Sequence, residues 1–240
     1  MDSSGLSLNR STYEHWKQNL SYIRALYFLL AIELIVALVW SSICLSFDSW
    51  ERWMDRWWEF GLAAAILCVI LLLASLFVSA VRKFPLNWVL YIVFTISFAY
   101  LCGFLSCWDN SRLFYYALWL LTAITVALFF YAYCSNYYMQ NITTLLVVLA
   151  SAGAVLVAFL TFTDFSVFKL ILVFVPVVIF GVYLAYDLRT TVRNSLFDHD
   201  EEDPVSGAVR IWIETVLVFC RFGELVGKMF HKTQNIQRWF

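Results

Sequence analysis

Three acidic residues stand inside strongly apolar stretches of the sequence: Glu33, Asp187 and Glu214. An ionisable side chain at membrane depth is costly, so it often marks an ion pathway, a proton relay or a paired structural charge. Asp187 and Glu214 together are the types of residue that form a two-carboxylate site for a cation or a shared proton. A structural pair satisfied by Arg210 is the alternative that the sequence leaves open. For Glu33 the alternatives are a neutral buried acid and an acid paired with an arginine.

The composition shows that these acids belong to a membrane protein. Of the 240 residues, 62% are hydrophobic and 14% are charged, whereas soluble domains have roughly 45–50% and about 25%. Charge-free stretches run from Phe60 to Val81, from Phe84 to Trp108 and from Leu113 to Thr163. Each is long enough for a spanning helix of about 20 residues, and the last is long enough for two. The net charge of -1 offers no basic surface, which excludes nucleic acid as a partner.

The apolar stretches predict an all-α polytopic bundle of seven helices, with six helices around a central charged seventh. Residues 1–24 are expected to be a cytoplasmic tail, residues 25–227 the transmembrane domain and residues 228–240 a basic tail. More Lys and Arg residues fall on the side of the amino terminus, which favours a cytoplasmic position for both ends. The six predicted spans are Ala25 to Phe47, Phe60 to Val81, Leu86 to Cys107, Leu113 to Ser135, Thr143 to Thr163 and Phe168 to Asp187.

The seventh segment, Val205 to Gly227, differs from the others because it carries four charged residues. At about 100° per residue they share one stripe about 80° wide. Inserting four central charges into lipid costs roughly 10 to 14 kcal/mol, while the apolar residues of the segment return only about 4 to 7 kcal/mol. We therefore expect the stripe to be shielded from lipid inside the bundle. Its members are Arg210, Glu214, Arg221 and Glu224.

The loop between the first two spans, Trp50 to Phe60, reads WERWMDRWWEF. As a helix it would place its aromatic residues and Met54 on one side and its charges on the other. Tryptophan prefers the membrane interface, so this segment is predicted to be a short helix in the headgroup plane.

Motifs for metal binding or catalysis are missing from the sequence. The cysteines form no CxxC pair, and we interpret them as small buried hydrophobic residues. The acidic run from Asp198 to Asp203 lacks the glycine and the terminal Glu of a calcium loop. No nucleophile stands beside a base, so we expect neither an enzyme nor a cofactor, and calcium enters only as a permeant ion. The six cysteines are Cys44, Cys68, Cys102, Cys107, Cys134 and Cys220.

Several of these segments together resemble the transmembrane BAX inhibitor motif family, in particular its Golgi anti-apoptotic and Lifeguard branch. The resemblance runs from about Arg24 to Gly227. It rests on IRALYFLLAIEL at the first span, on basic residues before Pro85-Leu86-Asn87, on GVYLAYDLR ending the sixth span, and on a charged last segment ending in ELVG.

The resemblance implies a pH-sensitive calcium leak channel of the endoplasmic reticulum, Golgi or plasma membrane that restrains cell death. Asp187 matches the acid that ends the sixth helix of the family. Glu214, in RIWIETV, takes the place of the Asp on the seventh helix, and the two acids would form the gate. Arg210 nearby and Glu33, where a Gln is usual, depart from the family pattern. Poxviruses and cytomegaloviruses carry copies of this family, and such departures would suit a viral copy.

Two functions of different classes follow. The first is a calcium-permeable leak gated by Asp187 and Glu214, with Arg210, Arg221, Glu224 and Glu33 as supporting charges. The second is a multipass adaptor without ion flux, which retains or redirects host membrane proteins through contacts in the lipid bilayer. Measurement of calcium flux separates the two.

Overall fold

The computed structural model describes residues 3–78, 80, 83–108, 112–135, 141–162, 167–195 and 203–213. Within these ranges the regular structure is helical and contains no strand, so the predicted all-α fold is confirmed. The last described residues, 204–213, form a further helix without a label of its own. The labelled helices are α1 (Ser3–Ser46), α2 (Asp48–Arg56), α3 (Trp58–Phe77), α4 (Leu86–Trp108), α5 (Leu113–Cys134), α6 (Asn141–Phe162) and α7 (Val167–Ser195).

Five of the described helices contain a stretch long and apolar enough to cross a membrane. These stretches are Leu20–Ser46, Trp58–Phe77, Leu86–Trp108, Leu113–Cys134 and Ile142–Thr161. The sixth predicted span is also helical, but α7 has 29 residues and its apolar part, Val173–Tyr186, is shorter. The chain is therefore a multipass membrane protein.

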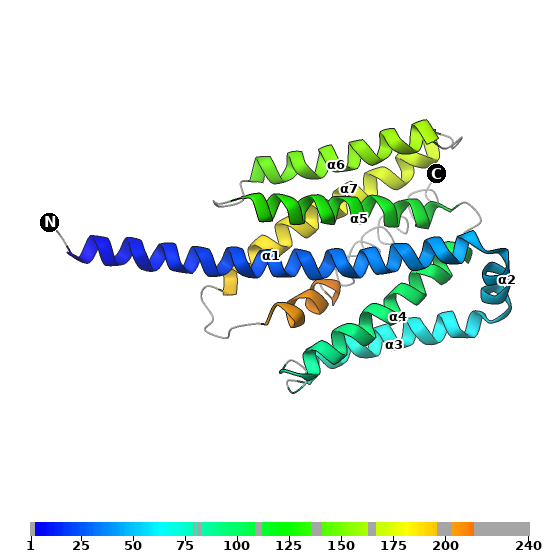
Figure 1. Cartoon of the computed structure of the whole chain (residues 1–240), viewed down its shortest axis with the longest axis horizontal. Coiled ribbons are helices and arrows are strands. Elements are labelled where there is room, and N and C mark those ends of the chain that lie inside the picture. The colour runs from blue at the N-terminus through cyan, green and yellow to red at the C-terminus, as the bar shows by residue number, and fades with distance from the viewer. Residues whose placement is uncertain are drawn as a thin grey trace, which may run out of the picture.

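The first helix extends beyond the first span. The predicted tail, residues 1–24, is largely helical, because α1 begins at Ser3 and continues without a break into the span. Its position in the cytoplasm stays a prediction. No proline interrupts this polar stretch, so the helix of the span can continue through it. Its first turns extend past the ends of the other helices (Figure 1).

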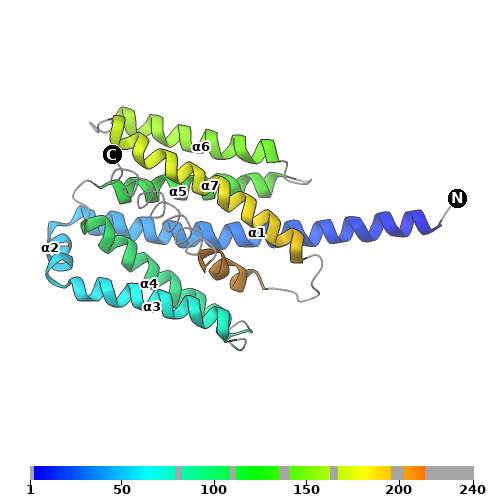
Figure 2. The same cartoon turned by 180° about the vertical axis from the view of Figure 1, so that it is seen from behind.

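Helix α1 lies in the middle of the bundle. Figures 1 and 2 show α3 and α4 on one side of it and α5 and α6 on the other, while α7 runs obliquely from the side of α6 across α1. Its most extensive contacts are with α4 and α5. Small residues lie in the first of these seams, where Ala37 belongs to the same buried cluster as Ala99 and Cys102. Small side chains allow two helices to approach closely in a membrane, where the apolar solvent provides little drive for association.

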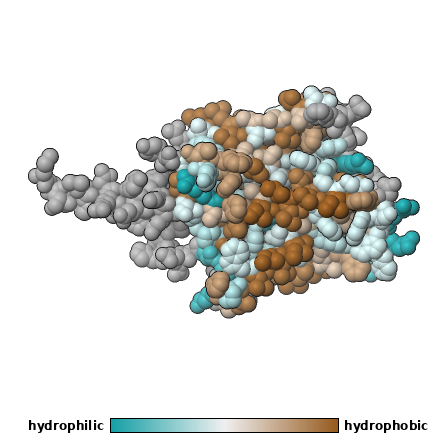
Figure 3. Space-filling view, in the orientation of Figure 1, coloured by the Kyte–Doolittle hydropathy of each residue, from teal (hydrophilic) through white to brown (hydrophobic). Residues whose placement is uncertain are grey.

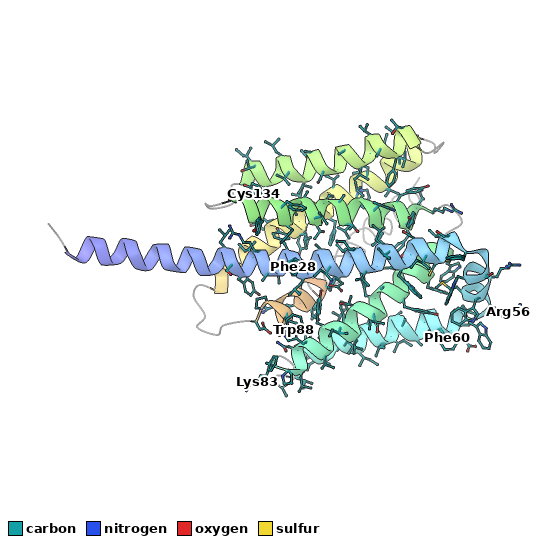
Figure 4. All side chains as sticks on the ribbon, in the orientation of Figure 1. Phe28, Arg56, Phe60, Lys83, Trp88 and Cys134 are labelled. Atoms are coloured by element: carbon teal, nitrogen blue, oxygen red, sulfur yellow. The ribbon has the colours of Figure 1, made fainter. Side chains whose placement is uncertain are left out.

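The outer helices present apolar side chains to the surroundings. In α3 and α6 only 17% of the spanning window is buried inside the protein, compared with 56% in α4. Large exposed residues on α3 include Leu62, Ile66 and Ile70. Figure 3 shows hydrophobic residues across the middle of the visible face, and Figure 4 places Arg56 and Lys83 at opposite ends of the bundle. This distribution suits a protein surrounded by lipid.

The tryptophan-rich loop contains the predicted short helix, α2, but this helix ends at Arg56 instead of Phe60, because residues 58–60 already belong to α3. Met54 points into the bundle and is 1% exposed, which fastens α2 over the ends of α1 and α4. Trp50 and Trp53 remain exposed and contact each other edge to face, with ring centroids 5.8 Å apart. Trp53 also stacks on Phe60 at the start of α3.

Candidate intramembrane acid site

The helix 204–213 is the element that positions the candidate site. It begins after Asp203, whose carbonyl accepts a hydrogen bond from the amide of Gly207, with Pro204 at a first position that suits proline. The side-chain amide of Asn87, at the start of α4, donates a hydrogen bond to the carboxylate of Asp203. Nine residues after Asp203, the ring of Trp212 packs on Phe98 of α4, with centroids 4.6 Å apart. The helix therefore runs alongside α4 in the same direction.

A glycine lets this helix pack directly against α1. A Cβ atom at Gly207 would collide with the hydroxyl of Tyr22 and would lie 3.1 Å from Leu26. On the same helix Val205, Ala208, Val209 and Ile211 are all buried. The described part of the predicted seventh segment thus packs against α1 and α4 through its apolar side. Because α1 occupies the middle of the bundle, the predicted arrangement of six helices around a central charged seventh is not confirmed in the described residues.

Glu33 is completely buried, with an exposed fraction of 0%. Its Oε2 atom accepts a hydrogen bond of 2.9 Å from the indole nitrogen of Trp212. Its Oε1 atom has no hydrogen-bond partner among the described residues. The proposed arginine partner is therefore not found in the part of the chain that the structure describes, and the neutral acid is the alternative that suits this surrounding, because an unpaired ion is very costly to bury.

A small, partly open cavity lies beside Trp212, where α1, α5, α7 and the helix 204–213 meet. Leu30 of α1, Thr125 of α5, Leu184 of α7 and Ile211 are among the side chains that line it. Helix α7 carries Asp187, and the helix 204–213 directly precedes Glu214. The shared cavity shows that these two elements approach each other in the interior.

The structure places the predicted gate residues only in part. Asp187 lies within α7, one helical turn after Leu184, but its side chain is outside the described residues, and so are Glu214, Arg221 and Glu224. Arg210 is described and is exposed, although its neighbours Val209 and Ile211 are buried. The pairing of Asp187 with Glu214 and the shielding of the charged stripe stay predictions.

Two residues of this site, Trp212 and Asn87, were not predicted from the sequence. Both residues use a polar side-chain group to contact another helix or its start, and each is far in sequence from its hydrogen-bond partner. The sequence feature that could have indicated Trp212 is that it is the single tryptophan in the aliphatic stretch after Arg210. Buried Trp side chains usually find an acceptor for their N–H group.

The described part of the chain contains no cluster of three or more His, Cys, Asp or Glu residues that would hold a metal ion. Cys44, Cys68 and Cys102 are buried and take no part in a disulfide. Their burial agrees with the interpretation of the cysteines as small buried residues, but Cys134 at the end of α5 is exposed, so the interpretation is wrong for that residue.

The spans, the inserted helix and the buried acid define the class of protein as a polytopic helical membrane protein with an ionisable group in its interior. Residues 19–231 match the family model described as inhibitor of apoptosis-promoting Bax1. The chain belongs to this family, as the sequence resemblance implied. It is also similar to protein lifeguard 3 of Mus musculus, with 19% identity over 212 residues, which cover 86% of this chain and 69% of the relative. No solved structure matches the chain.

Proposed function

We propose that this protein is a pH-sensitive, calcium-permeable leak channel of an intracellular membrane, which lowers the calcium content of the store and thereby restrains apoptosis. Membership of a family described as inhibitor of apoptosis-promoting Bax1 supports the anti-apoptotic part of the proposal. The endoplasmic reticulum or the Golgi is the proposed compartment. The proposed activity requires no enzymatic reaction and no cofactor.

One observation carries the ion-pathway part of the proposal: the helix 204–213 is inserted among the spans and is hydrogen-bonded to a completely buried acid. Apolar packing is not the only interaction that holds this helix, because Trp212 also donates a hydrogen bond to the buried Glu33. The helix leads directly to Glu214, and α7, which shares the cavity with it, carries Asp187. Polar and ionisable groups inside a membrane bundle are the usual parts of an ion pathway.

Asp187 and Glu214 would act as a latch between α7 and the last segment. With one proton shared between them, the two carboxyl groups can hydrogen-bond and hold the two helices together. When both are ionised they repel each other and provide oxygen ligands for a divalent cation. A free-energy difference of a few kcal/mol between the closed and the open packing of these two helices is enough to shift the equilibrium from one to the other. Flux should therefore rise as the pH rises.

Flux into liposomes tests the proposal directly. Purified full-length protein is reconstituted into liposomes that contain a calcium-sensitive dye, and calcium is added outside. We expect dye fluorescence to rise faster than in empty liposomes and faster at pH 8 than at pH 6. Folded protein that gives no flux above empty liposomes would refute the channel and leave the adaptor function, in which the protein redirects host membrane proteins by intramembrane contacts.

A further inference from the structure

Two thiols from different spans meet at the end of the bundle that α2 covers. Cys44 lies in the last turn of α1, and Cys107 is the second-last residue of α4. Their side chains are hydrogen-bonded to each other. Cys44 and Cys107 each lie near the end of a membrane-spanning stretch, since these stretches end at Ser46 and Trp108.

Close packing of α1 on α4 brings these thiols together. At Gly103, one turn before Cys107, a Cβ atom would lie 3.2 Å from the Sγ atom of Cys44 and 2.7 Å from the ring of Trp40. A side chain at Gly103 would thus force the ring of Trp40 or the helices themselves to move. The absence of a side chain there places Cys44 against the backbone of α4 and within reach of Cys107.

The surroundings of the pair favour reaction between the two thiols over metal binding. Cys44 is 0% exposed and Cys107 is 7% exposed, in a cluster with Met54 and Phe104. The described residues provide no third metal ligand beside them. Met54 belongs to α2, a helix of only 9 residues with Trp50 and Trp53 exposed on its outer side. A small displacement of this helix would expose the thiols to a reagent at the membrane surface.

We infer that Cys44 and Cys107 are a redox-active dithiol, which a small-molecule disulfide of the glutathione class oxidises to an intramolecular disulfide between α1 and α4. One thiol loses its proton and attacks the reagent disulfide, which forms a mixed disulfide and releases one reagent thiol. The second thiol then loses its proton and attacks the protein sulfur, which releases the second reagent thiol. The protein is oxidised by two electrons and the reagent disulfide is reduced to two thiols.

The disulfide would fix the seam between α1 and α4 at the end that carries α2. Cross-linking two residues far apart in sequence reduces the freedom of the unfolded chain, which raises stability when the native geometry is undistorted. Oxidised protein should therefore melt at a higher temperature than reduced protein. If the amino terminus is cytoplasmic, this end of the bundle faces the lumen, where thiols are more readily oxidised than in the cytosol.

Counting reactive thiols tests the inference. Purified full-length protein in lipid nanodiscs is incubated with graded ratios of oxidised to reduced glutathione, denatured in SDS, and labelled with a maleimide polymer that adds a visible mass to each thiol. The chain has six cysteines, and we expect oxidation to remove two of the six tags. Mass spectrometry should identify a peptide pair joined between Cys44 and Cys107.

Single substitutions show whether the loss of two tags comes from Cys44 and Cys107. Cys44→Ser and Cys107→Ser should each abolish the two-tag loss, whereas Cys68→Ser and Cys134→Ser should retain it. Wild-type protein that stays monodisperse and keeps all six tags at every ratio would overturn the inference. A disulfide that joins any other two cysteines would overturn it as well, and this result requires no variant to fold.

Discussion

The indole nitrogen of Trp212 and the Oε2 atom of Glu33 lie 2.9 Å apart in the interior of the bundle. This hydrogen bond joins the helix 204–213 to the middle of α1. It leaves the Oε1 atom of Glu33 without a partner among the described residues. Because Glu33 is completely buried, the bond fixes the position of the inserted helix more strongly than an exposed contact would.

Removing the donor should therefore destabilise the protein. Trp212→Phe keeps an aromatic ring against Phe98 but leaves both oxygens of Glu33 unpaired, which should lower the free energy of unfolding by about 1–3 kcal/mol. The measurement is equilibrium unfolding in mixed micelles with increasing SDS. In a Glu33→Leu background the same change should have little effect, because no acceptor remains to be stranded. Equal effects in the two backgrounds would show that the hydrogen bond does not matter.

Gly207 should tolerate no side chain. Gly207→Ala places a methyl group against the hydroxyl of Tyr22, so it should lower the unfolding midpoint of the purified protein. Adding Tyr22→Phe should recover part of the loss because it removes the atom that clashes. Gly153→Ala is the matched control, since a Cβ atom there meets nothing within 4 Å and alanine favours a helix by up to about 1 kcal/mol over glycine. If the two alanine variants were equally stable, the packing of the inserted helix against α1 would be wrong.

Arg24 caps the carboxyl end of α5. Its guanidinium group donates to the backbone carbonyls of Ala132 and Ser135, both at 2.9 Å, and lies over the ring of Tyr133. A cation there also favours the negative end of the helix dipole. Lysine cannot reproduce this two-pronged geometry, so Arg24→Lys should lower stability by about 0.5–1.5 kcal/mol.

The control for this variant is Arg56→Lys at the exposed end of α2. It should leave the unfolding midpoint unchanged. The same small loss in both variants would indicate a general effect of lysine rather than loss of the cap.

The helices were predictable because apolar length and charged boundaries act locally. The third predicted span, Leu86 to Cys107, is observed as α4 at Leu86–Trp108. The fourth predicted span, Leu113 to Ser135, is observed as α5 at Leu113–Cys134. In both, a charged residue directly before or after the apolar run sets the boundary. The start of α1 at Ser3 was not predicted, because hydropathy reports the membrane span and not the helix that continues beyond it.

The side-chain partners of the site were not predictable in the same way. Glu33 was identified as a buried acid from its apolar neighbours alone, which the structure confirms. Its partner Trp212 is 179 residues away in sequence, and Asn87 is 116 residues from Asp203. Such pairs depend on how helices are rotated and shifted against one another, and one sequence does not encode that in any local pattern.

The orientation of the chain gives a prediction that is independent of ion flux. With the amino terminus in the cytoplasm, the acceptor sequences at Asn9 and Asn19 should remain unglycosylated when the protein is made in mammalian cells. The measurement is gel mobility before and after endoglycosidase treatment. A shift that the enzyme removes, and that Asn9→Gln or Asn19→Gln abolishes, would place the amino terminus in the lumen.

The proposed gate is tested most directly by the pH profile of calcium flux in liposomes that contain wild-type protein, the Asp187→Asn, Glu214→Gln double variant or Glu33→Gln. Neither Asn nor Gln can ionise, so the double variant should lose the rise in flux between about pH 6 and 8. Glu33→Gln should keep most of it, because Gln still accepts the hydrogen bond from Trp212. A flat profile in the double variant beside a rising one in wild-type protein is the predicted result, and a wild-type profile in the folded double variant would contradict the gate.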